Sequence, residues 1–259
     1  MSKRVIEGVV FGMALFVSSV AWGAHPLITD DAETQGMGKV QVEFNGQYDT
    51  DKETVNGITT ESTGAQVMTI LSYGLADNTD LVLTLPYQWG KVKEEGITIY
   101  DERGISDTTL EVKWRFFEKD GLMLALKPGV IFPTGNESRG LGAGKVGYHA
   151  VFIGTKEAEP WEFHANVGYI RNENKVDEER DIWHVSLAAE YAVFKNLALV
   201  GNIGMERNRD RTASGNPAFI LGGAVYEVSE HFSLDCGLKY GLTAAETDWS
   251  LLAGVAFRF

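Results

Sequence analysis

The sequence predicts an all-β protein, a transmembrane antiparallel up-and-down β-barrel of about 12 strands. Three observations support this prediction: an export signal at the N-terminus, a series of segments in which apolar and polar residues alternate, and a last strand that ends on an aromatic residue. Of the 259 residues, 23 are basic and 36 are acidic, which gives a formal net charge of -13. This acidic balance argues against a nucleic-acid partner.

The N-terminal residues, 1–23, have the pattern of a secretory signal peptide. Lys3 and Arg4 precede an apolar run, and Ala21 and Gly23 supply the small residues of a cleavage site. The alternative is a retained inner-membrane anchor, for which the run is too short and wrongly flanked. No later segment reaches the ~18 consecutive apolar residues of a spanning helix, so membrane insertion requires strands that close into a barrel.

Residues 38–259 form a series of alternating segments, which we assign to the wall of the barrel. In the first of them Val40, Val42 and Phe44 share one face and Glu43 lies on the other, because side chains alternate along a strand. The predicted strands are, in order, 40–48, 66–75, 80–90, 108–117, 121–133, 145–155, 161–171, 183–193, 197–206, 217–228, 232–242 and 249–259.

The connections between these strands alternate between short turns and long polar loops. This alternation is typical of outer-membrane barrels, which have periplasmic turns and extracellular loops. An even number of strands then leaves both ends of the barrel on the periplasmic side. The long loops are expected near 50–63, 93–105, 134–144, 172–181, 207–216 and 243–248.

The predicted inner faces of the strands carry many charged side chains. A soluble sandwich or lipocalin-like barrel would bury these charges in a dry core, at a prohibitive cost, whereas a wet lumen accommodates them. Two roles remain open for them: they pair across strands and stiffen the wall, or they form a path that selects a solute. The candidate lumen-lining residues are Glu43, Glu111, Lys113, Arg115, Lys127, His164, His184, Glu190, Asp235 and Lys239.

We predict no catalytic residues, no metal site and no cofactor. His149, His164, His184 and Ser186 fall on inner faces, but two residues on one strand do not make a catalytic triad. The spacing of the histidines does not bring three metal ligands together locally. The single cysteine, Cys236, excludes an intramolecular disulfide.

The residues between the export signal and the first strand, 24–37, have two interpretations. They form either a periplasmic tail or a plug that folds into the lumen and gates it. The plug hypothesis rests on the Asp30–Asp31 pair, since it precedes a wall that carries several inward-facing cations. We expect these two carboxylates to meet Lys113, Arg115 or Lys127.

The last strand resembles the C-terminal signal strand of bacterial outer-membrane barrels. Its odd positions are apolar, and it ends on Phe257 and Phe259. The resemblance implies that these two residues form a signal read by the outer-membrane assembly machinery. We expect the strand to pair with the first strand and to place Phe259 beside Val40.

Several short motifs in the mature sequence resemble one family. They are Ala24-His-Pro-Leu-Ile-Thr-Asp-Asp31, Gln35-Gly-Met-Gly-Lys39, Tyr73-Gly-Leu75, Leu85-Pro-Tyr87, the strand from Gly104 to Phe116, and Pro128-Gly-Val-Ile-Phe-Pro-Thr-Gly135. Their order is similar to that of the outer-membrane transporter-like family described as "putative MetA-pathway of phenol degradation". The resemblance implies an outer-membrane barrel that passes small organic molecules, aromatic or hydrophobic ones among them.

The expected function is therefore a passive channel in the outer membrane. Its expected partners are membrane lipid, lipopolysaccharide, the assembly machinery and a small-molecule solute, and we expect a monomer. The alternative is a structural or surface-interaction barrel whose lumen is closed. Conductance across a bilayer separates these two hypotheses.

Overall fold

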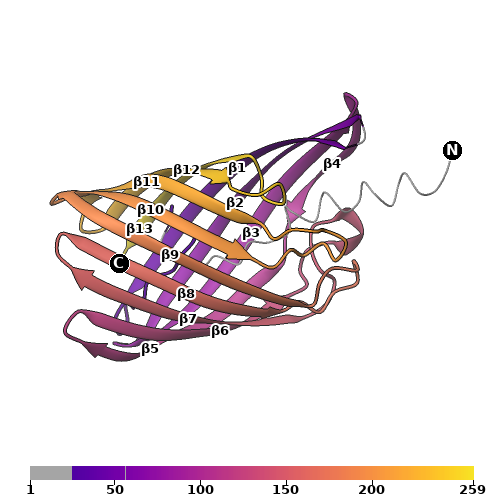
Figure 1. The fold of residues 1–259 in the computed structure, drawn as a ribbon. Coiled ribbons are helices and arrows are strands. Elements are labelled where there is room, and N and C mark those ends of the chain that lie inside the picture. Colours follow the sequence, from indigo (N-terminus) through magenta and orange to yellow (C-terminus); the bar gives the residue numbers. More distant parts are fainter. Residues whose placement is uncertain (1–24, 56) are drawn as a thin grey trace.

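The wall of the molecule is a closed antiparallel sheet, seen in a computed structural model that describes residues 25–55 and 57–259 (Figure 1). Strands that are consecutive in sequence pair with each other, except that β4 and β5 both pair with β3, and the pairing of β1 with β13 closes the barrel. The signal peptide predicted for residues 1–23 lies outside the described residues. The elements are β1 (Val40–Val55), β2 (Ile58–Ala76), β3 (Thr79–Glu94), β4 (Ile97–Ile105), β5 (Thr108–Lys119), β6 (Leu122–Phe132), the short 3₁₀ helix η2 (Glu137–Arg139), β7 (Gly147–Ala158), β8 (Trp161–Arg171), β9 (Asp181–Phe194), β10 (Leu197–Glu206), β11 (Ala218–Ser229), β12 (Phe232–Gly241) and β13 (Trp249–Arg258).

The predicted fold class is confirmed, with one strand more than predicted. The wall has twelve strand positions, because β4 and β5 run in the same direction along β3 and together fill a single position. Tyr87 of β3 faces Ile105 of β4, whereas Thr84 faces Thr109 of β5. The interruption between β4 and β5 lies opposite Pro86, whose carbonyl accepts a hydrogen bond from the Ser106 N–H at 3.0 Å.

Two predicted loops, 50–63 and 93–105, are largely strand instead. The chain continues to pair beyond the predicted strand ends (Figure 1). The β1–β2 pairing extends to Val55 and Ile58, and a two-residue turn closes the hairpin β3–β4. Glu95 and Gly96 both have positive φ angles, of 49° and 79°, as the favoured two-residue hairpin turn requires. The polar composition of these segments reflects their exposure to water rather than a lack of regular structure.

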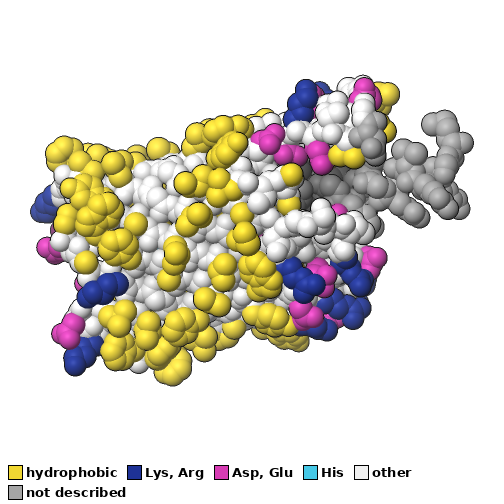
Figure 2. All heavy atoms as spheres, in the orientation of Figure 1, with side chains coloured by type: hydrophobic (Ala, Val, Ile, Leu, Met, Phe, Trp, Pro, Cys, Tyr) yellow, Lys and Arg dark blue, Asp and Glu magenta, His cyan; other side chains and the backbone are white. Residues whose placement is uncertain are grey.

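Apolar side chains cover the outside of the barrel, and polar side chains point inward. On β8, Val167 is 59% exposed while Asn166 is 2% exposed, and on β9 the same holds for Leu187 (59%) and Ser186 (4%). Figure 2 shows the resulting apolar surface along the wall, with charged side chains gathered at the two ends. A surface of this size and polarity is unfavourable in water and suits contact with lipid.

Aromatic pairs mark both ends of the apolar surface. Trp161 packs on Tyr191 near the short turns, with ring centroids 4.7 Å apart. Tyr240 packs on Trp249 near the long loops at 4.6 Å. Such girdles are typical of the two membrane–water interfaces. No helix in the described part of the chain is both long enough and apolar enough to cross a membrane.

The seam of the barrel joins the first and last strands, as predicted. Gln41 faces Arg258, and Val42 faces Phe257. The backbones of Val40 and Phe259 exchange two hydrogen bonds, of 3.1 and 2.8 Å. The ring of Phe257 stacks on Phe232 of β12 with centroids 4.9 Å apart.

The loop between β6 and β7 folds back onto the interruption between β4 and β5. The buried carboxylate of Asp107 accepts hydrogen bonds from the N–H groups of Gly135 (2.9 Å) and Ala143 (2.7 Å). The side chain of Leu141 packs over Gly104, and a Cβ atom on Gly104 would lie only 2.9 Å from it. These contacts tie the loop to the wall at the long-loop end of the barrel.

Candidate functional site: the lumen and the segment that crosses it

Residues 25–37, which we call the lumen segment, run across the inside of the barrel before β1 begins. The segment starts beside β12, where the ring of His25 pairs with the carboxylate of Asp235. Pro26 follows and lies against Gly223 and Gly237 of the wall. Glycine favours this close approach, because a Cβ atom on Gly237 would be only 3.0 Å from Pro26.

The next residues of the segment are buried on the β9–β13 side of the lumen. Leu27, 3% exposed, packs in an apolar cluster on the inner wall, whose other members include Leu221 and Leu252. The side chain of Asn202 binds the segment beside this cluster. Its Oδ1 accepts from the N–H groups of Ile28 (2.7 Å) and Thr29 (3.1 Å), and its Nδ2 donates to the Thr29 hydroxyl at 2.6 Å.

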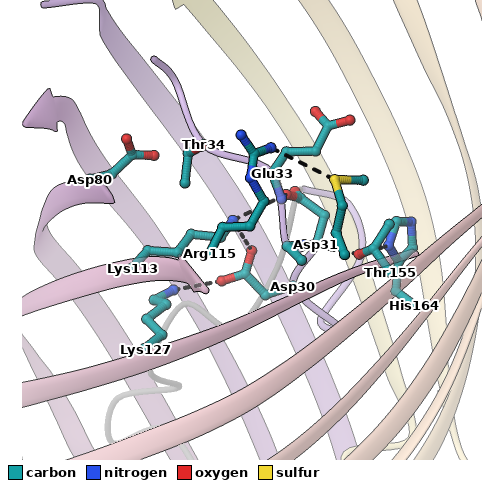
Figure 3. A network of polar contacts seen from close by, with 12 residues as sticks. Asp30, Asp31, Glu33, Thr34, Asp80, Lys113, Arg115, Lys127, Thr155 and His164 are labelled. Carbon is teal, nitrogen blue, oxygen red and sulfur yellow. Dashed lines mark hydrogen bonds and ion pairs between the residues drawn. The ribbon is translucent and has the colours of Figure 1, made fainter. Parts of the chain in front are cut away.

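Two acidic residues then bridge to cations on the opposite wall (Figure 3). The carboxylate of Asp30 contacts Lys113 Nζ of β5 at 3.1 Å and Lys127 Nζ of β6 at 2.7 Å. Asp31 contacts Lys113 as well, at 3.1 Å. The side chains of Asp30 and of both lysines are at most 10% exposed, so these ion pairs are weakly screened by water.

The ion-pair network continues into the wall beyond the lysines. Lys127 Nζ lies 3.4 Å from Glu111 Oε1, and the same oxygen bonds His149 Nε2 at 2.9 Å. Gly129 makes room for this contact, because a Cβ atom there would lie 2.5 Å from the His149 ring. The charges therefore alternate in sign from the lumen segment into the wall.

Side chains of the wall also bind the backbone of the segment, at the two aspartates and in the residues that follow them. Thr155 of β7 accepts from the Ala32 N–H at 2.9 Å. The amide of Asn166, oriented to satisfy both groups, pairs with the N–H and the carbonyl of Asp30. Farther along, the Asp80 carboxylate accepts from the Gln35 N–H at 3.0 Å.

The segment leaves the lumen at the turn between β2 and β3. The Gly38 N–H donates to the Gly74 carbonyl at 2.8 Å, and the Gly74 N–H donates to the Lys39 carbonyl at 3.0 Å. Gly36 has a φ of 85°, and a Cβ atom on Gly74 would collide with its carbonyl oxygen. The two sequence motifs that contain Gly36 and Gly74 therefore pack against each other through their backbones.

The charges around the segment shift the pKa values of its acids. Partial burial raises the pKa of Asp31, but the positive charges of Lys113 and His164 outweigh it, so the pKa lies below the ordinary value of 3.8. The charge of Asp31 raises the pKa of Glu33 above the ordinary value of 4.5. Asp31 is therefore ionised at neutral pH, where it can hold Lys113.

A cavity of about 700 Å³ lies between the segment and the wall toward the short-turn end. Lys113 and Lys127 line it, together with the apolar side chains of Ile70 and Val82. Most other charged residues of its lining are acidic, among them Glu33, Glu43, Glu162, Glu190, Glu227, Glu230 and Asp235. A cavity of this volume is in the range of small-molecule sites.

Apart from Asp235, the other sequence-predicted lumen residues make their contacts with the wall and its connections. Glu43 accepts hydrogen bonds from Gln41 (2.8 Å) and Asn45 (3.0 Å), and Lys239 pairs with Glu246 at 2.9 Å. Arg115 contacts Glu118 and the Asp77 carbonyl near a short turn. Of the three cations expected to meet the Asp30–Asp31 pair, Lys113 and Lys127 do so.

The histidines form separate contacts rather than one cluster. His164 bonds Thr155 at 3.0 Å and lies 3.4 Å from Glu190. His184 Nε2 lies 3.0 Å from the Ser186 hydroxyl, and its Nδ1 lies 3.8 Å from Glu206. Ser186 is buried, with 4% of its surface exposed. Among the described residues, no group of three or more His, Cys, Asp or Glu side chains is arranged to hold a metal ion.

Sequence reasoning missed the uncharged side chains that hold the segment. Asn202, Thr155 and Asn166 occupy inward positions on three different strands. In the sequence they can be recognised only as uncharged polar residues at the inward-facing positions of their strands, which recur every second residue. This signal is weak, because the same pattern is found wherever a strand faces water.

Comparison with known proteins identifies the family. The sequence pattern of the family described as "Putative MetA-pathway of phenol degradation" matches residues 29–259. The chain belongs to this family. The matched range begins inside the lumen segment and extends over all the strands of the wall. A search of curated proteins gave no significant match for this member of the MetA-pathway family.

Solved structures similar to this family member are outer-membrane barrels. The COG4313 outer membrane channel from Pseudomonas putida F1 aligns with a TM-score of 0.67 at 17% identity, over 94% of this chain and 100% of that one. The KdgM porin in complex with disordered oligogalacturonate aligns at 0.57 and 8% identity, over 85% and 99%. The translocator domain of the autotransporter NalP from Neisseria meningitidis aligns at 0.53 and 15%, over 86% and 89%. At these identities the likeness establishes the fold.

Proposed function

We propose that this protein is an outer-membrane channel that passes small organic molecules, aromatic or hydrophobic ones among them, by passive diffusion, and that the lumen segment gates it. One observation carries the proposal: a barrel that is apolar outside and polar inside is crossed by a segment of its own chain. Membership of the MetA-pathway family and the likeness to a COG4313 outer membrane channel support it.

The location follows from the same features. Residues 1–23 export the chain, and the apolar surface between the aromatic girdles contacts lipid. The charged loops at the long-loop end face lipopolysaccharide, and the short turns face the periplasm. The barrel acts as a monomer, since its sheet closes on itself and leaves no strand of the seam unpaired. Phe257 and Phe259 serve as the assembly signal.

The lumen segment is suited to a gate because the wall does not depend on it. Residues 38–259 close into a barrel through the β1–β13 and β2–β3 pairings, whereas residues 25–37 add side-chain and backbone contacts from inside. Removing the segment breaks ion pairs and a few hydrogen bonds but no strand pairing. The segment can therefore leave the lumen while the barrel remains folded.

A closed structural barrel is the second candidate. The observation that favours it is the filling of the lumen: Leu27 and Ile28 pack with inner-wall apolar clusters on both sides. In that case the segment is a permanent part of the core, and the barrel conducts nothing under any condition.

A reversible lock on the segment separates the two candidates. The side chains of Thr29 in the segment and Asn202 in the adjacent wall are in contact, so Thr29→Cys with Asn202→Cys, in a Cys236→Ser background, is designed to form a disulfide between segment and wall. In planar bilayers we expect the oxidised protein to stay closed and the reduced protein to show single-channel openings. Liposome swelling with small neutral solutes gives the same comparison for flux.

The unmodified chain and a deletion of residues 25–35 complete the experiment. The deletion is expected to increase conductance, because it removes the segment from the lumen. No difference in conductance between the unmodified chain and the deletion, with both barrels folded, would contradict the gate. Silence of all forms, including the deletion, would favour the closed structural barrel.

A further inference from the structure

The cations that hold the lumen segment form a compact pair inside the barrel. Lys113 on β5 and Lys127 on β6 both reach the carboxylate of Asp30, and each contacts a different oxygen. We propose that this lysine pair is a binding site for the carboxylate group of a small organic anion, and that Asp30 occupies the site in the closed channel. The inference rests on the proposed channel function, because the anion reaches the lysines only when the segment moves.

The geometry of the contact is that of a bound carboxylate. Oδ1 of Asp30 lies 3.1 Å from Lys113 Nζ, and Oδ2 lies 2.7 Å from Lys127 Nζ. Both are charge-assisted hydrogen bonds in a buried place, where they are stronger than at a surface. The carboxylate of a free organic acid can make the same two bonds, since it has the same shape and charge.

Withdrawal of the lumen segment removes the two carboxylates that contact Lys113 directly and leaves it only Asp80, its neighbour across the β3–β5 pairing, at longer range. In the described part of the chain, both carboxylates that pair with Lys113 belong to the lumen segment. Lys127 has a wall carboxylate in Glu111, at 3.4 Å, but Glu111 also bonds His149. Uncompensated buried charge is costly, so withdrawal of the segment favours entry of another anion.

The surroundings also fit the rest of an organic acid. The cavity of about 700 Å³ is lined by both lysines and by Ile70 and Val82. Val82 lies opposite Glu111 in the β3–β5 pairing, next to the strand position of Lys113, and packs with Met68 and Ile70. A ligand can therefore place its carboxylate on the lysines and an apolar body on this patch.

The acidic lining of the cavity makes the lysine contacts decisive. Glu33, Glu162 and Glu190 line the same cavity and repel an anion. Binding must therefore depend on the direct bonds to Lys113 and Lys127, and loss of either lysine should abolish it. The same acids disfavour return of an anion that has left the lysines toward the short-turn end.

Calorimetry with benzoate tests the site on the full mature chain in detergent. We expect Asp30→Asn to bind benzoate at least tenfold more tightly than the unmodified chain, because the competing carboxylate is gone. The affinity for benzyl alcohol, which has the same ring without the charge, should be the same in both proteins. Addition of Lys113→Gln to Asp30→Asn should remove benzoate binding. Equal affinities of the Asp30→Asn variant for benzoate and benzyl alcohol would overturn the proposal.

A second measurement does not require the Asp30 variant to fold. In a Thr29→Cys, Cys236→Ser chain, benzoate should accelerate maleimide labelling of residue 29, because an anion that replaces Asp30 on the lysines favours the withdrawn segment. Benzyl alcohol and benzylamine should not. The absence of acceleration at saturating benzoate would refute the site.

Failure of the channel hypothesis gives a different result. If the protein is a closed barrel, swelling with neutral solutes stays absent in every form, and benzoate reaches the lysines in neither the unmodified chain nor the Asp30→Asn variant. If the channel hypothesis holds and the lysine site does not, neutral solutes pass through the barrel, and benzoate binding does not depend on Lys113 or Lys127.

Discussion

Replacement of Asp30 by asparagine tests the ion pairs that hold the lumen segment. The change keeps the shape of the side chain and removes the charge that both lysines contact. Breaking a buried ion pair costs about 3–5 kcal/mol when a charge is left uncompensated. Here Lys113 keeps Asp31 at 3.1 Å, and Lys127 keeps Glu111 at 3.4 Å, so we expect the lower end of this range.

If the free energy that docks the segment falls by about 3 kcal/mol, the population of the withdrawn segment rises by a factor of roughly 150. Thr29, which is fully buried in the docked segment, reports this population when it is replaced by cysteine in a Cys236→Ser background. Maleimide reacts with residue 29 only after withdrawal, so its labelling rate should rise by the same factor when opening and closing are fast.

The matched control is Asp49→Asn. Asp49 is another buried aspartate on the inner face, but its side chain accepts a hydrogen bond from Gln47 on the same strand, at 2.7 Å. This variant should leave the labelling rate within about threefold of the parent. An equally small change for Asp30→Asn would refute the assignment of the ion pairs as the attachment of the segment.

Three further predictions use the same reporter or the same barrel. Gly237→Ala should increase labelling of residue 29, because the new Cβ lies 3.0 Å from Pro26, whereas Gly222→Ala, with nothing within 4 Å, should not. Lowering the pH should first tighten docking, as Glu33, whose pKa is raised above 4.5 in the folded state, takes up a proton; Glu33→Gln should abolish this step. Below pH 3.8 docking should loosen, because Asp31, whose folded pKa is lowered, contributes only while it is ionised. Since the thiolate is the reactive form, the rate at residue 29 is divided by that of a free thiol at the same pH, and a ratio that does not change with pH would contradict both signs. Deletion of Phe259 should reduce the amount of assembled barrel, measured by heat-modifiable migration, while the conductance of each assembled channel stays the same, since Phe259 lies at the end of the seam.

Much of the wall was predictable because its signal is local. A strand between lipid and a wet lumen alternates apolar and polar residues, and this period is visible in a single sequence. The predicted segments 108–117, 232–242 and 249–259 match β5, β12 and β13 within two residues at each end. The partner of the last strand was predictable too, because a closed barrel leaves it no neighbour but β12 and β1.

The extended hairpins were not predicted, although a signal for one of them is present. Asn56-Gly57 is the favoured pair for a two-residue hairpin turn, and β1 and β2 pair up to Val55 and Ile58 on either side of it. The long strands beyond the membrane have two polar faces, so the alternation that identifies the wall is absent there. Pairing in this region depends on the register set by the membrane-embedded part of the same strands.

The sequence by itself determined the fold class, the order of the strands and the face on which each side chain lies, because these depend on residues that are near one another in the chain. Only the tertiary structure decided that the N-terminal segment crosses the lumen, and that Asp30 meets Lys113 and Lys127 rather than Arg115. These contacts join residues 83 and 97 positions apart in the chain. Their partners are selected by the diameter of the closed barrel and the path of the segment through it, and neither leaves a periodic trace in the sequence.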